Sequence, residues 1–344
     1  MNKIRHDLSA RKLGLIIAVF LVISLLAGIV CVFFGSAALG VGEVFSILLP
    51  GGGPAEEIPF NIVIYQRVPR VLLALMAGGG LAVAGAVFQA LLRNPLATPH
   101  TLGVSAGGAL GAAVAILFDL TFPSFGAFGM VQICGLAGSL GVMIIIYLLA
   151  RHKERFSTLK LLLAGVTMAL VASAMIMFVR YMADPHKLVR LDRWLMGGLQ
   201  VNSYRTLAAV LPLYLPAVVL LFSQLSNLNQ LAFGEELAAG RGLNVPAVQI
   251  SAFVGGSLLT ASIVSVAGPI GFVGLIIPHT IRLILGPDHR VLLFGSFFAG
   301  AAFLAIADTF ARTVLAPTEL PVGVLTAMLG GPFFLVLLIR KRDW

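Results

Sequence analysis

The chain has 344 residues, of which 59% are hydrophobic and 11% are charged, and its formal net charge is +9. Its mean hydropathy is +1.03. A soluble domain carries about 25% charged and about 45–50% apolar residues. A chain this apolar cannot cover its own surface with polar groups, so much of that surface must face membrane lipid. The composition therefore excludes a soluble globular protein. Its basic residues lie in short loops between apolar runs, which favours topology signals over nucleic-acid binding, and we expect no nucleic-acid partner.

Hydrophobic segments long enough to cross a bilayer recur along the whole chain. A membrane-spanning helix needs about 20 mostly apolar residues. By that measure we expect an all-α, polytopic protein with about ten transmembrane helices, near residues 13–34, 64–91, 100–118, 128–150, 160–181, 206–226, 247–266, 271–286, 291–310 and 321–340. The second segment is long and the eighth is short. The first is too long for a signal peptide and no Ala-x-Ala-like site follows it. We expect one transmembrane domain over residues 1–344.

The orientation of these segments follows from the lysines and arginines. Most of the 23 basic residues fall on one side of the membrane if the N-terminus is cytoplasmic. Basic loops remain in the cytoplasm. Both termini are therefore expected to be cytoplasmic, with residues 1–12 as a cytoplasmic tail and residues 227–246 as a cytoplasmic loop. Arg67 and Arg70 fall on the outer side, where topology does not explain them.

A weak internal repeat divides the chain into two halves of five spans. An odd number of spans turns a duplicated unit upside down, and transporters often contain such inverted repeats. The sequence GGGL at 78–81 precedes PHT at 99–101 by nearly the same separation as GGSL at 255–258 precedes PHT at 278–280. We therefore expect two inverted five-helix halves. Chance similarity in a glycine-rich chain is the alternative.

Sequence motifs for nucleotide or metal chemistry are missing. The chain contains no GxxxxGK[ST] phosphate loop and no HExxH. We therefore expect no enzymatic activity, no cofactor and no metal site in this chain. Any energy from ATP would come from a partner subunit.

A series of motifs in a fixed order resembles a known family. In the first half these are RVPR at 67–70, Gln89 with RNPLATP at 93–99, and GVSAG at 103–107. The second half contributes Trp194 with GG at 197–198, GEE at 234–236, AGPIGFVGLIIPH at 267–279 with Arg282, GPDHR at 286–290, AD at 307–308 with Arg312, ELPVG at 319–323 and GGPF at 330–333. From about residue 36 onward the chain resembles the FecCD-like permeases, the membrane subunits of ABC importers for iron-siderophores, haem and cobalamin.

The resemblance implies a function and a set of partners. Two permease copies, expected as a homodimer, would enclose a central pathway in the bacterial plasma membrane, with ATP-binding cassette ATPase subunits bound inside and a substrate-binding protein outside. The cargo would be a metal chelate, with an iron-siderophore as the first choice and haem or cobalamin as alternatives. The rival class is an ion-driven secondary transporter. Paired acids within the membrane would be evidence for that class, and the chain has almost none. A membrane enzyme is a second rival, but it would show a group of catalytic residues, and none is visible in the sequence.

Arg67 and Arg70 flank the start of the second span. Their side chains could reach the lipid headgroups. Alternatively, they could form a positive docking patch for carboxylates of a binding protein, where charge complementarity speeds encounter and fixes register. The resemblance favours docking and adds Arg312 to the patch.

Residues 234–245 are polar enough to lie outside the bilayer. Glu235 and Glu236 lie at an expected helix start, where acidic side chains are stabilised by the positive end of the helix dipole. Two alanines would leave that helix a thin face. The segment is either a solvated connector or a coupling helix that lies in a groove of the ATPase. The resemblance favours coupling, with Arg241 standing where the family usually has leucine. The predicted coupling residues are Glu235, Glu236, Ala238, Ala239, Arg241 and Gly242.

The break Gly268-Pro269-Ile270-Gly271 interrupts an apolar run. Exposed backbone at membrane depth is tolerated where protein or a water-filled cavity satisfies it, so the break is expected to line or shape the pathway. Asp308 lies within the ninth span, where an acid is costly and points to a function. Arg312, four residues on, is its expected neutralising neighbour. A buried structural pair and a substrate contact both stay open. The expected pathway and structural residues are Gln89, Asn94, Pro95, Gly268, Pro269, Gly271 and Asp308.

His279 and Arg282 share one helix face near the cytoplasmic end, with Asp288 nearby. A single histidine without a carboxylate at ligand spacing is a poor metal site. We therefore expect these two residues to anchor the inner end of a helix or to contact the ATPase.

Overall fold

The computed structural model describes residues 10–49, 57–120, 128–152, 155–201 and 203–340. Its helices are α1 (Ala10–Phe33), α2 (Val41–Leu48), α3 (Glu57–Asn61), the π-helical η1 (Ile62–Arg67), α4 (Val68–Leu91), α5 (Val104–Leu117), α6 (Met130–Ala150), α7 (Thr158–Met182), α8 (Pro185–Leu195), α9 (Tyr204–Ser223), α10 (Leu225–Leu231), α11 (Glu235–Gly240), α12 (Val245–Ala267), α13 (Val273–Leu285), α14 (His289–Thr313) and α15 (Val322–Arg340). The two-residue strands β1 (Arg151–His152) and β2 (Arg155–Phe156) pair antiparallel between α6 and α7. The predicted all-α class is confirmed.

Each predicted span coincides with an apolar helix. Among the described residues, seven helices are long and apolar enough to cross a membrane, and the shorter apolar helices Val104–Leu117, Val273–Leu285 and Val322–Val336 match the remaining predicted spans. The second span is long because α3, η1 and α4 run on as one helical stretch of 35 residues, Glu57–Leu91. The short helices α2, α3, α8 and α10 were not predicted from the sequence.

Polar side chains set the starts of several helices. Asp184 accepts a hydrogen bond from the backbone N–H of Lys187 and Pro185 occupies the first turn, so α8 begins there. Asn244 caps α12 in the same way, and Asp288 caps α14 by accepting from the N–H of Arg290. These caps set where α8, α12 and α14 begin.

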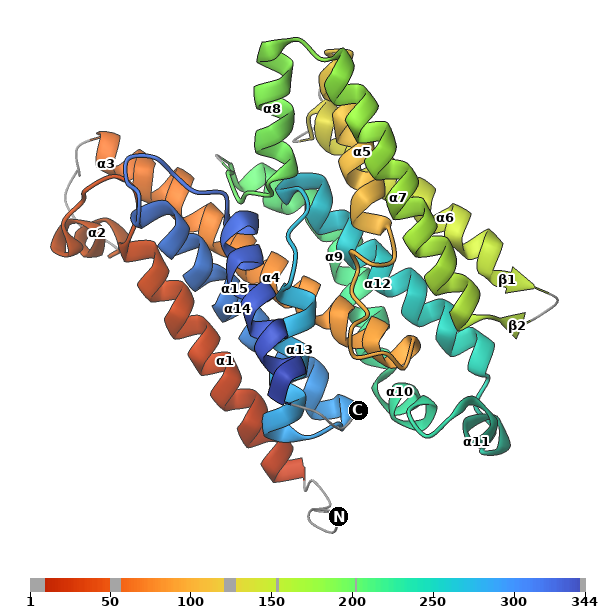
Figure 1. The fold of residues 1–344 in the computed structure, drawn as a ribbon. Helices are drawn as coiled ribbons and strands as arrows, with labels where there is room; N and C mark the ends of the chain where they lie inside the picture. Colours follow the sequence, from red (N-terminus) through yellow and green to blue (C-terminus); the bar gives the residue numbers. More distant parts are fainter. Residues whose placement is uncertain (1–9, 50–56, 121–127, 153–154, 202, 341–344) are drawn as a thin grey trace.

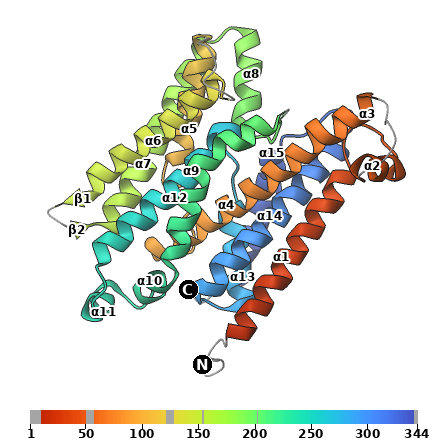
Figure 2. The same cartoon turned by 180° about the vertical axis from the view of Figure 1, so that it is seen from behind.

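The two ends of the bundle differ in what they contain (Figures 1 and 2). α1 begins and α15 ends toward the end where α10 and α11 lie, which we call the inner end. The helices α2, α3 and α8 lie at the opposite, outer end. This arrangement agrees with an even number of spans. The side of the membrane that each end faces stays a prediction, and residues 1–9 of the expected tail lie outside the described residues.

Helix α4 is the centre of the bundle. In the span that contains it, 83% of the most apolar stretch is buried, against 22% for α1 and 17% for α7. Glycines allow its backbone to touch two neighbours. A Cβ added to Gly78 would collide with the carbonyl of Gly300 in α14, and one added to Gly85 would collide with the carbonyl of Gly274 in α13. Small residues allow such close approach between membrane helices.

The two halves share an order of elements but not the predicted sequence repeat. In each half a long buried helix, α4 or α12, is followed by a non-helical stretch and a shorter helix, α5 or α13. The residues before these shorter helices, Gly103 and Phe272, both have positive φ, 74° and 66°. However, the first PHT segment, 99–101, precedes α5, whereas the second, 278–280, lies inside α13. The sequence echo therefore does not mark equivalent positions, and the inverted repeat stays a prediction.

Candidate functional site

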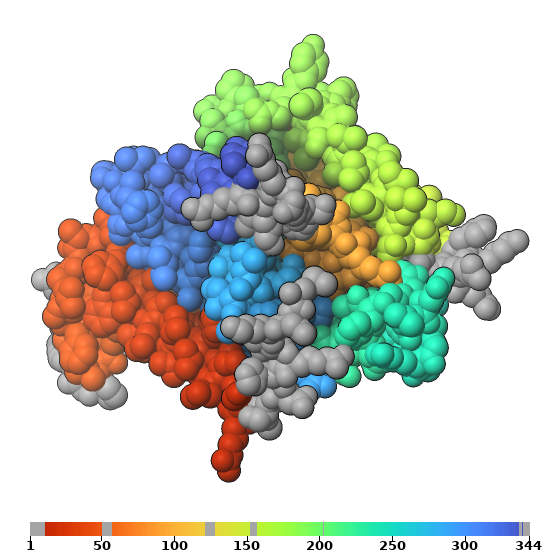
Figure 3. Space-filling model, turned by 60° about the horizontal axis from the view of Figure 1, so that its bottom comes forward, coloured from red at the N-terminus to blue at the C-terminus, as the bar shows by residue number. Residues whose placement is uncertain are grey.

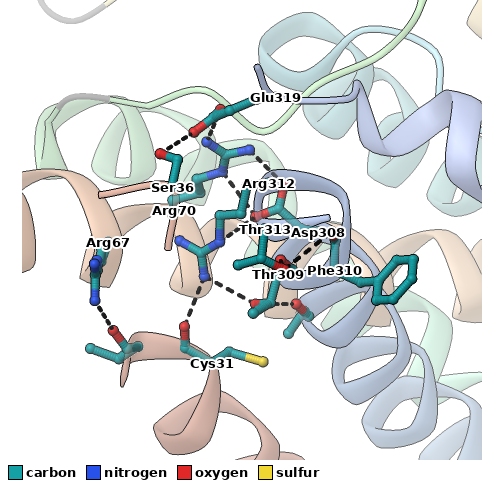
Figure 4. A network of polar contacts seen from close by, with 12 residues as sticks. Cys31, Ser36, Arg67, Arg70, Asp308, Thr309, Phe310, Arg312, Thr313 and Glu319 are labelled. Carbon is teal, nitrogen blue, oxygen red and sulfur yellow. Dashed lines mark hydrogen bonds and ion pairs between the residues drawn. The ribbon is translucent and has the colours of Figure 1, made fainter. Parts of the chain in front are cut away.

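The outer end holds a buried cluster of charged residues (Figure 4). Arg70, in the first turn of α4, binds Asp308 of α14 through two hydrogen bonds: Nε donates to Oδ2 and Nη2 donates to Oδ1, both at 2.9 Å. Its Nη1 donates to Oε2 of Glu319 at 2.7 Å. Asp308 is 1% exposed. Arg70 therefore ties together α4, α14 and the loop before α15.

The other two arginines of the cluster turn toward the end of α1. Arg67 donates to the carbonyl oxygens of Val32, Phe33 and Ala37. The last carbonyls of a helix have no intrahelical partner, and a basic side chain can satisfy them. Arg312 donates through Nη2 to the carbonyl of Cys31 at 2.8 Å and to Oγ1 of Thr309 at 3.0 Å. Both arginines thereby fix α1 to the rest of the bundle.

Two expectations about this cluster change. Arg312 Nε lies 3.8 Å from Asp308 Oδ2, so the main partner of Asp308 is Arg70, which is 238 residues away, and not its helical neighbour. Arg67 is 3% exposed and Arg312 is 2% exposed, so neither side chain extends to lipid headgroups. Arg67, Arg70 and Arg312 do come together as predicted, but their guanidinium groups point into the protein. Their role in docking stays a prediction.

A cavity of about 240 Å³ opens beside these arginines. It is lined by Gly35, Ser36, Ala37, Ile62, Gln66, Arg67, Arg70, Gln200, Val201, Arg312 and Glu319. Its charged lining residues are three arginines and one carboxylate, Glu319. Two further carboxylates act on these arginines: Asp308 binds Arg70, and the charge of Glu43 acts on Arg67. Burial raises the pKa of Glu319, but the hydrogen bond and the charge of Arg70 outweigh burial and hold that pKa below its usual value. Glu319 therefore stays ionised at neutral pH, and it accepts a hydrogen bond from Ser36 Oγ at 2.8 Å.

The predicted coupling segment forms a short helix at the inner end. Ala238 of α11 is 1% exposed and packs with Leu231, Val245 and Val248, so it faces the bundle and not a partner. The outward face instead presents Leu237, which is 61% exposed, next to the exposed Glu236. Sequence reasoning missed Leu237, although a large apolar residue in a polar loop was a usable signal.

Phe233, just before α11, is a second apolar side chain at this surface. It is 65% exposed, and the guanidinium of Arg241 lies over its ring at 5.5 Å from the centroid. Arg241 stands at the position where the resembling family usually has leucine. Together with Leu237 and Glu236 it gives this surface, which we call the α11 face (Phe233, Glu236, Leu237 and Arg241), a mixed apolar and charged character.

Glu235 has partners within the chain. Its Oε1 lies 3.3 Å from Nη2 of Arg93, in the turn after α4. The same oxygen accepts a hydrogen bond from Nε2 of Gln249 in α12 at 3.2 Å. Glu235 and its neighbour Glu236, predicted to act alike, are therefore in different environments.

Backbone groups from other segments form hydrogen bonds around the break before α13. Gly268 has φ 66°, and the N–H of Gly198 donates to the carbonyl of Ala267 at 2.8 Å. The N–H of Gly323 donates to the carbonyl of Gly197 at 3.1 Å. The end of α8, the break and the start of α15 thus share hydrogen bonds, which satisfies backbone groups that the break leaves free. Whether Gly268, Pro269 and Gly271 line a pathway stays a prediction.

The remaining predicted residues are structural in their contacts. Gln89 Nε2 donates to the carbonyl of Gly274 at 3.3 Å and so links α4 to α13. Asn94 Oδ1 accepts from the N–H of Leu96, which shapes the turn that contains Pro95. These contacts leave a role of Gln89, Asn94 and Pro95 in the pathway as a prediction.

The predicted inner-end anchor, His279 and Arg282, lies in α13, and a separate set of polar contacts forms near it. His279 is buried in α13 and Arg282 lies one turn further along. Asp288 does not join them at a metal-like site: its Oδ1 accepts from Asn229 Nδ2 at 2.8 Å, and Asn229 Oδ1 accepts from the N–H of His289. This junction ties α10 to the start of α14. No group of three or more candidate metal-binding side chains occurs in the described part of the chain.

The segment GVSAG at 103–107 fits the GxSxG pattern of hydrolases. In those enzymes the serine stands on a sharp turn between a strand and a helix. Here Ser105 is buried within the first turn of α5 and follows a loop, so this structural context is missing.

The apolar helices of the described residues are those of a polytopic membrane protein. The model of the FecCD transport family matches residues 19–340. The chain therefore belongs to the FecCD transport family.

Relatives of known name are similar over most of their length. The hemin transport system permease protein of Yersinia pestis is 39% identical over 84% of this chain and 86% of its own. The vitamin B12 import system permease protein of Escherichia coli O9:H4 is 40% identical over 82% and 85%. The iron(3+)-hydroxamate import system permease protein of Bacillus subtilis is 35% identical over 91% and 95%.

A solved structure shares the fold. It is described as an inward-facing conformation of a metal-chelate type ABC transporter, and it matches with a TM-score of 0.80 and 30% identity over 96% of this chain and 99% of that one. The chain is accordingly a multi-pass membrane permease of the ABC importer type.

Proposed function

We propose that this chain is the permease subunit of an ABC importer that carries an iron-siderophore across a bacterial plasma membrane, with both termini in the cytoplasm. The observation that carries the proposal is the family match over residues 19–340. Among the three permeases named above, the iron-hydroxamate permease aligns over the largest shares, 91% of this chain and 95% of its own. Haem and cobalamin are the alternative cargoes, because the hemin and vitamin B12 permeases are similar at 39% and 40% identity.

The α11 face supports a bound ATPase at the inner end. Phe233 and Leu237 are large apolar side chains that lie outside the spanning helices and are exposed. Exposed apolar side chains rimmed by charges are typical of a protein interface. Since the sequence has no phosphate loop, ATP hydrolysis is assigned to that partner. A rival secondary transporter gains no support from Asp308, because Arg70 neutralises it.

A Leu237→Asp variant is expected to weaken ATPase binding about 30-fold or more, because a buried apolar anchor at an interface is worth about 2 kcal/mol or more. The measurement titrates the co-purifying ATPase onto permease in lipid nanodiscs. In parallel, the uptake of labelled ferric hydroxamate, haemin and cobalamin is measured in cells that express the variants. Leu237→Met keeps the apolar volume and is the matched control, expected to behave as the parent.

Two outcomes would contradict the proposed function. Equal ATPase affinity of the Leu237→Asp variant would remove the α11 face from the interface. Absence of uptake for all three chelates, with the ATPase bound, would reject a metal-chelate importer.

Native mass spectrometry of the same preparation counts permease copies, for which we expect two. The weakly buried helices α1 and α7 leave apolar faces for lipid or for that second copy.

We further propose that the outer cavity receives an acidic side chain of an external binding protein. Its support is the lining of the cavity, where Arg67, Arg70 and Arg312 lie with a single carboxylate, Glu319. A water molecule occupies about 30 Å³, so a cavity of about 240 Å³ has room for a carboxylate group. Charges at a rim act mainly on association rate and on its salt dependence.

The docking proposal is tested at Gln200, an exposed residue of the cavity lining with no charge of its own. Gln200→Glu is expected to slow association of the binding protein about tenfold at low salt, and Gln200→Lys is expected to speed it. Stopped-flow association at two salt concentrations measures both. Equal rates for the two variants would separate the cavity from docking. Reversing the arginines themselves is less informative, because it would also break their internal bonds.

A further inference from the structure

The turn between α4 and α5 is rigid and carries one strained residue. Thr98 and Thr101 exchange hydrogen bonds between backbone N–H groups and side-chain oxygens, and the N–H of Asn94 donates to the carbonyl of Gln89. Arg93 begins this turn with φ 47°. A non-glycine residue seldom adopts a positive φ, and such strain persists where the surrounding structure over-determines it. The conformation presents Arg93 at the inner end of the molecule.

Arg93 meets the coupling segment there. Its Nη2 lies 3.3 Å from Oε1 of Glu235 at the start of α11, and this oxygen also accepts from Nε2 of Gln249. Gln249 is 1% exposed, so its amide is held in place. One carboxylate oxygen thus joins α11 to both the α4–α5 turn and α12. In Figure 3 the α10–α11 region (teal) lies beside the α4–α5 segment (orange).

The contact continues into the centre of the bundle. Gln89, one turn before Arg93, donates to the carbonyl of Gly274 in α13. Gly85, one turn before Gln89, touches the backbone of Gly274 as well. A displacement of Arg93 would therefore move the inner part of α4 together with α13.

We propose that Glu235 and Arg93 are positioning residues that transmit the movement of α11 to α4, and that Glu235 does not contact the ATPase itself. This inference rests on the proposed function. The two side chains are 43% and 44% exposed, and an ion pair this exposed contributes little to stability. Its loss is therefore expected to appear in coupling and not in folding. Glu236, exposed and without a hydrogen bond or ion pair among the described residues, is left to face the ATPase.

The experiment compares single variants with a charge exchange. Arg93→Glu and Glu235→Arg each replace the pair by two like charges, whereas the double variant restores an opposite pair in reverse order. The parent and each variant are reconstituted with the co-purified ATPase, and ATP hydrolysis and cargo uptake are measured together. Each single variant is expected to bind the ATPase normally and to lower uptake per ATP about fivefold or more, the lower range of couplings between distant sites. The double variant is expected to recover most of this loss.

Glu236→Arg is the matched control, with the same charge change one residue along the same helix. It is expected to weaken ATPase binding, which the Arg93 and Glu235 variants leave normal, and so separates a contact residue from the positioning pair. Parental uptake per ATP in both single variants would overturn the proposal, as would failure of the double variant to recover in a complex that assembles.

A second measurement does not depend on the transport function. Hydrogen exchange of the amides of 234–244 is followed on the permease alone in nanodiscs. Both single variants are expected to exchange faster there, and the double variant and Glu236→Arg are expected to match the parent. Unchanged exchange in the single variants would show that the joint does not hold α11, whatever the cargo is. Faster exchange with no uptake of any tested chelate by the parent would instead count against the proposed function alone.

Discussion

An Asp308→Asn variant is expected to lose about 3–5 kcal/mol of folding stability, because removing one partner of a buried ion pair leaves the other charge uncompensated. An asparagine would keep one acceptor oxygen for Arg70, and the bond of Arg70 to Glu319 would stay, but a donor amide nitrogen would replace the other acceptor. The buried negative charge between Arg70 and Arg312 would be lost. Denaturation of the purified protein in mixed micelles, with helicity as the signal, measures the change. Uptake is expected to fall with the amount of folded protein.

Asp192→Asn supplies the matched control. Asp192 also pairs with an arginine, Arg180, but these side chains are 31% and 44% exposed. An exposed pair contributes about 0–1 kcal/mol, so this variant is expected to unfold close to the parent. A small loss for Asp308→Asn, equal to that of the control, would show that the outer cluster does not hold α4 against α14. An Arg70→Met, Asp308→Leu double variant is expected to recover part of the loss.

A Gly85→Val variant is expected to lose about 3 kcal/mol or more, the upper end of the cost of overpacking. The first atom of the new side chain would collide with the backbone of Gly274, so α4 and α13 would have to separate. The same denaturation assay measures the loss. Because α13 follows the break at 268–271, uptake is expected to fall even in the fraction that folds.

Gly141→Val is the control for the change of residue type. Gly141 lies in α6, and nothing lies within 4 Å of a Cβ added there. Replacing a helical glycine at an open position removes an unfavourable residue and is expected to be neutral or mildly stabilising. Equal stability of the Gly85 and Gly141 variants would mean that α4 and α13 are not in backbone contact.

The two ends of the molecule are connected through one helix. α4 carries Arg70 at its outer end and leads into Arg93 at its inner end, and it touches α14 and α13 in between. The outer cavity and the α11 face are therefore attached to opposite ends of the most buried span. This arrangement is why variants at either end are expected to affect the same transport cycle.

The sequence determined the class of the protein and the places of its spans. The thickness of the bilayer sets the length of an apolar helix, so composition and hydropathy were enough to place the seven long and three shorter apolar helices of the described residues. They could not reveal α8 and α10, since short helices with polar faces carry no such length signal. The order of the motifs along the chain indicated the family, and the family match over residues 19–340 confirms it.

The tertiary structure decided the partners of the charged residues. Helical spacing suggested Arg312 for Asp308, but packing brings Arg70 to it from another helix. Glu235 and Glu236 are adjacent in the sequence, yet Arg93 and Gln249 bind the first and leave the second exposed. Spacing along one helix shows which residues share a face. Which distant side chain meets that face depends on how helices pack, and here glycine contacts between α4 and its neighbours fix that packing.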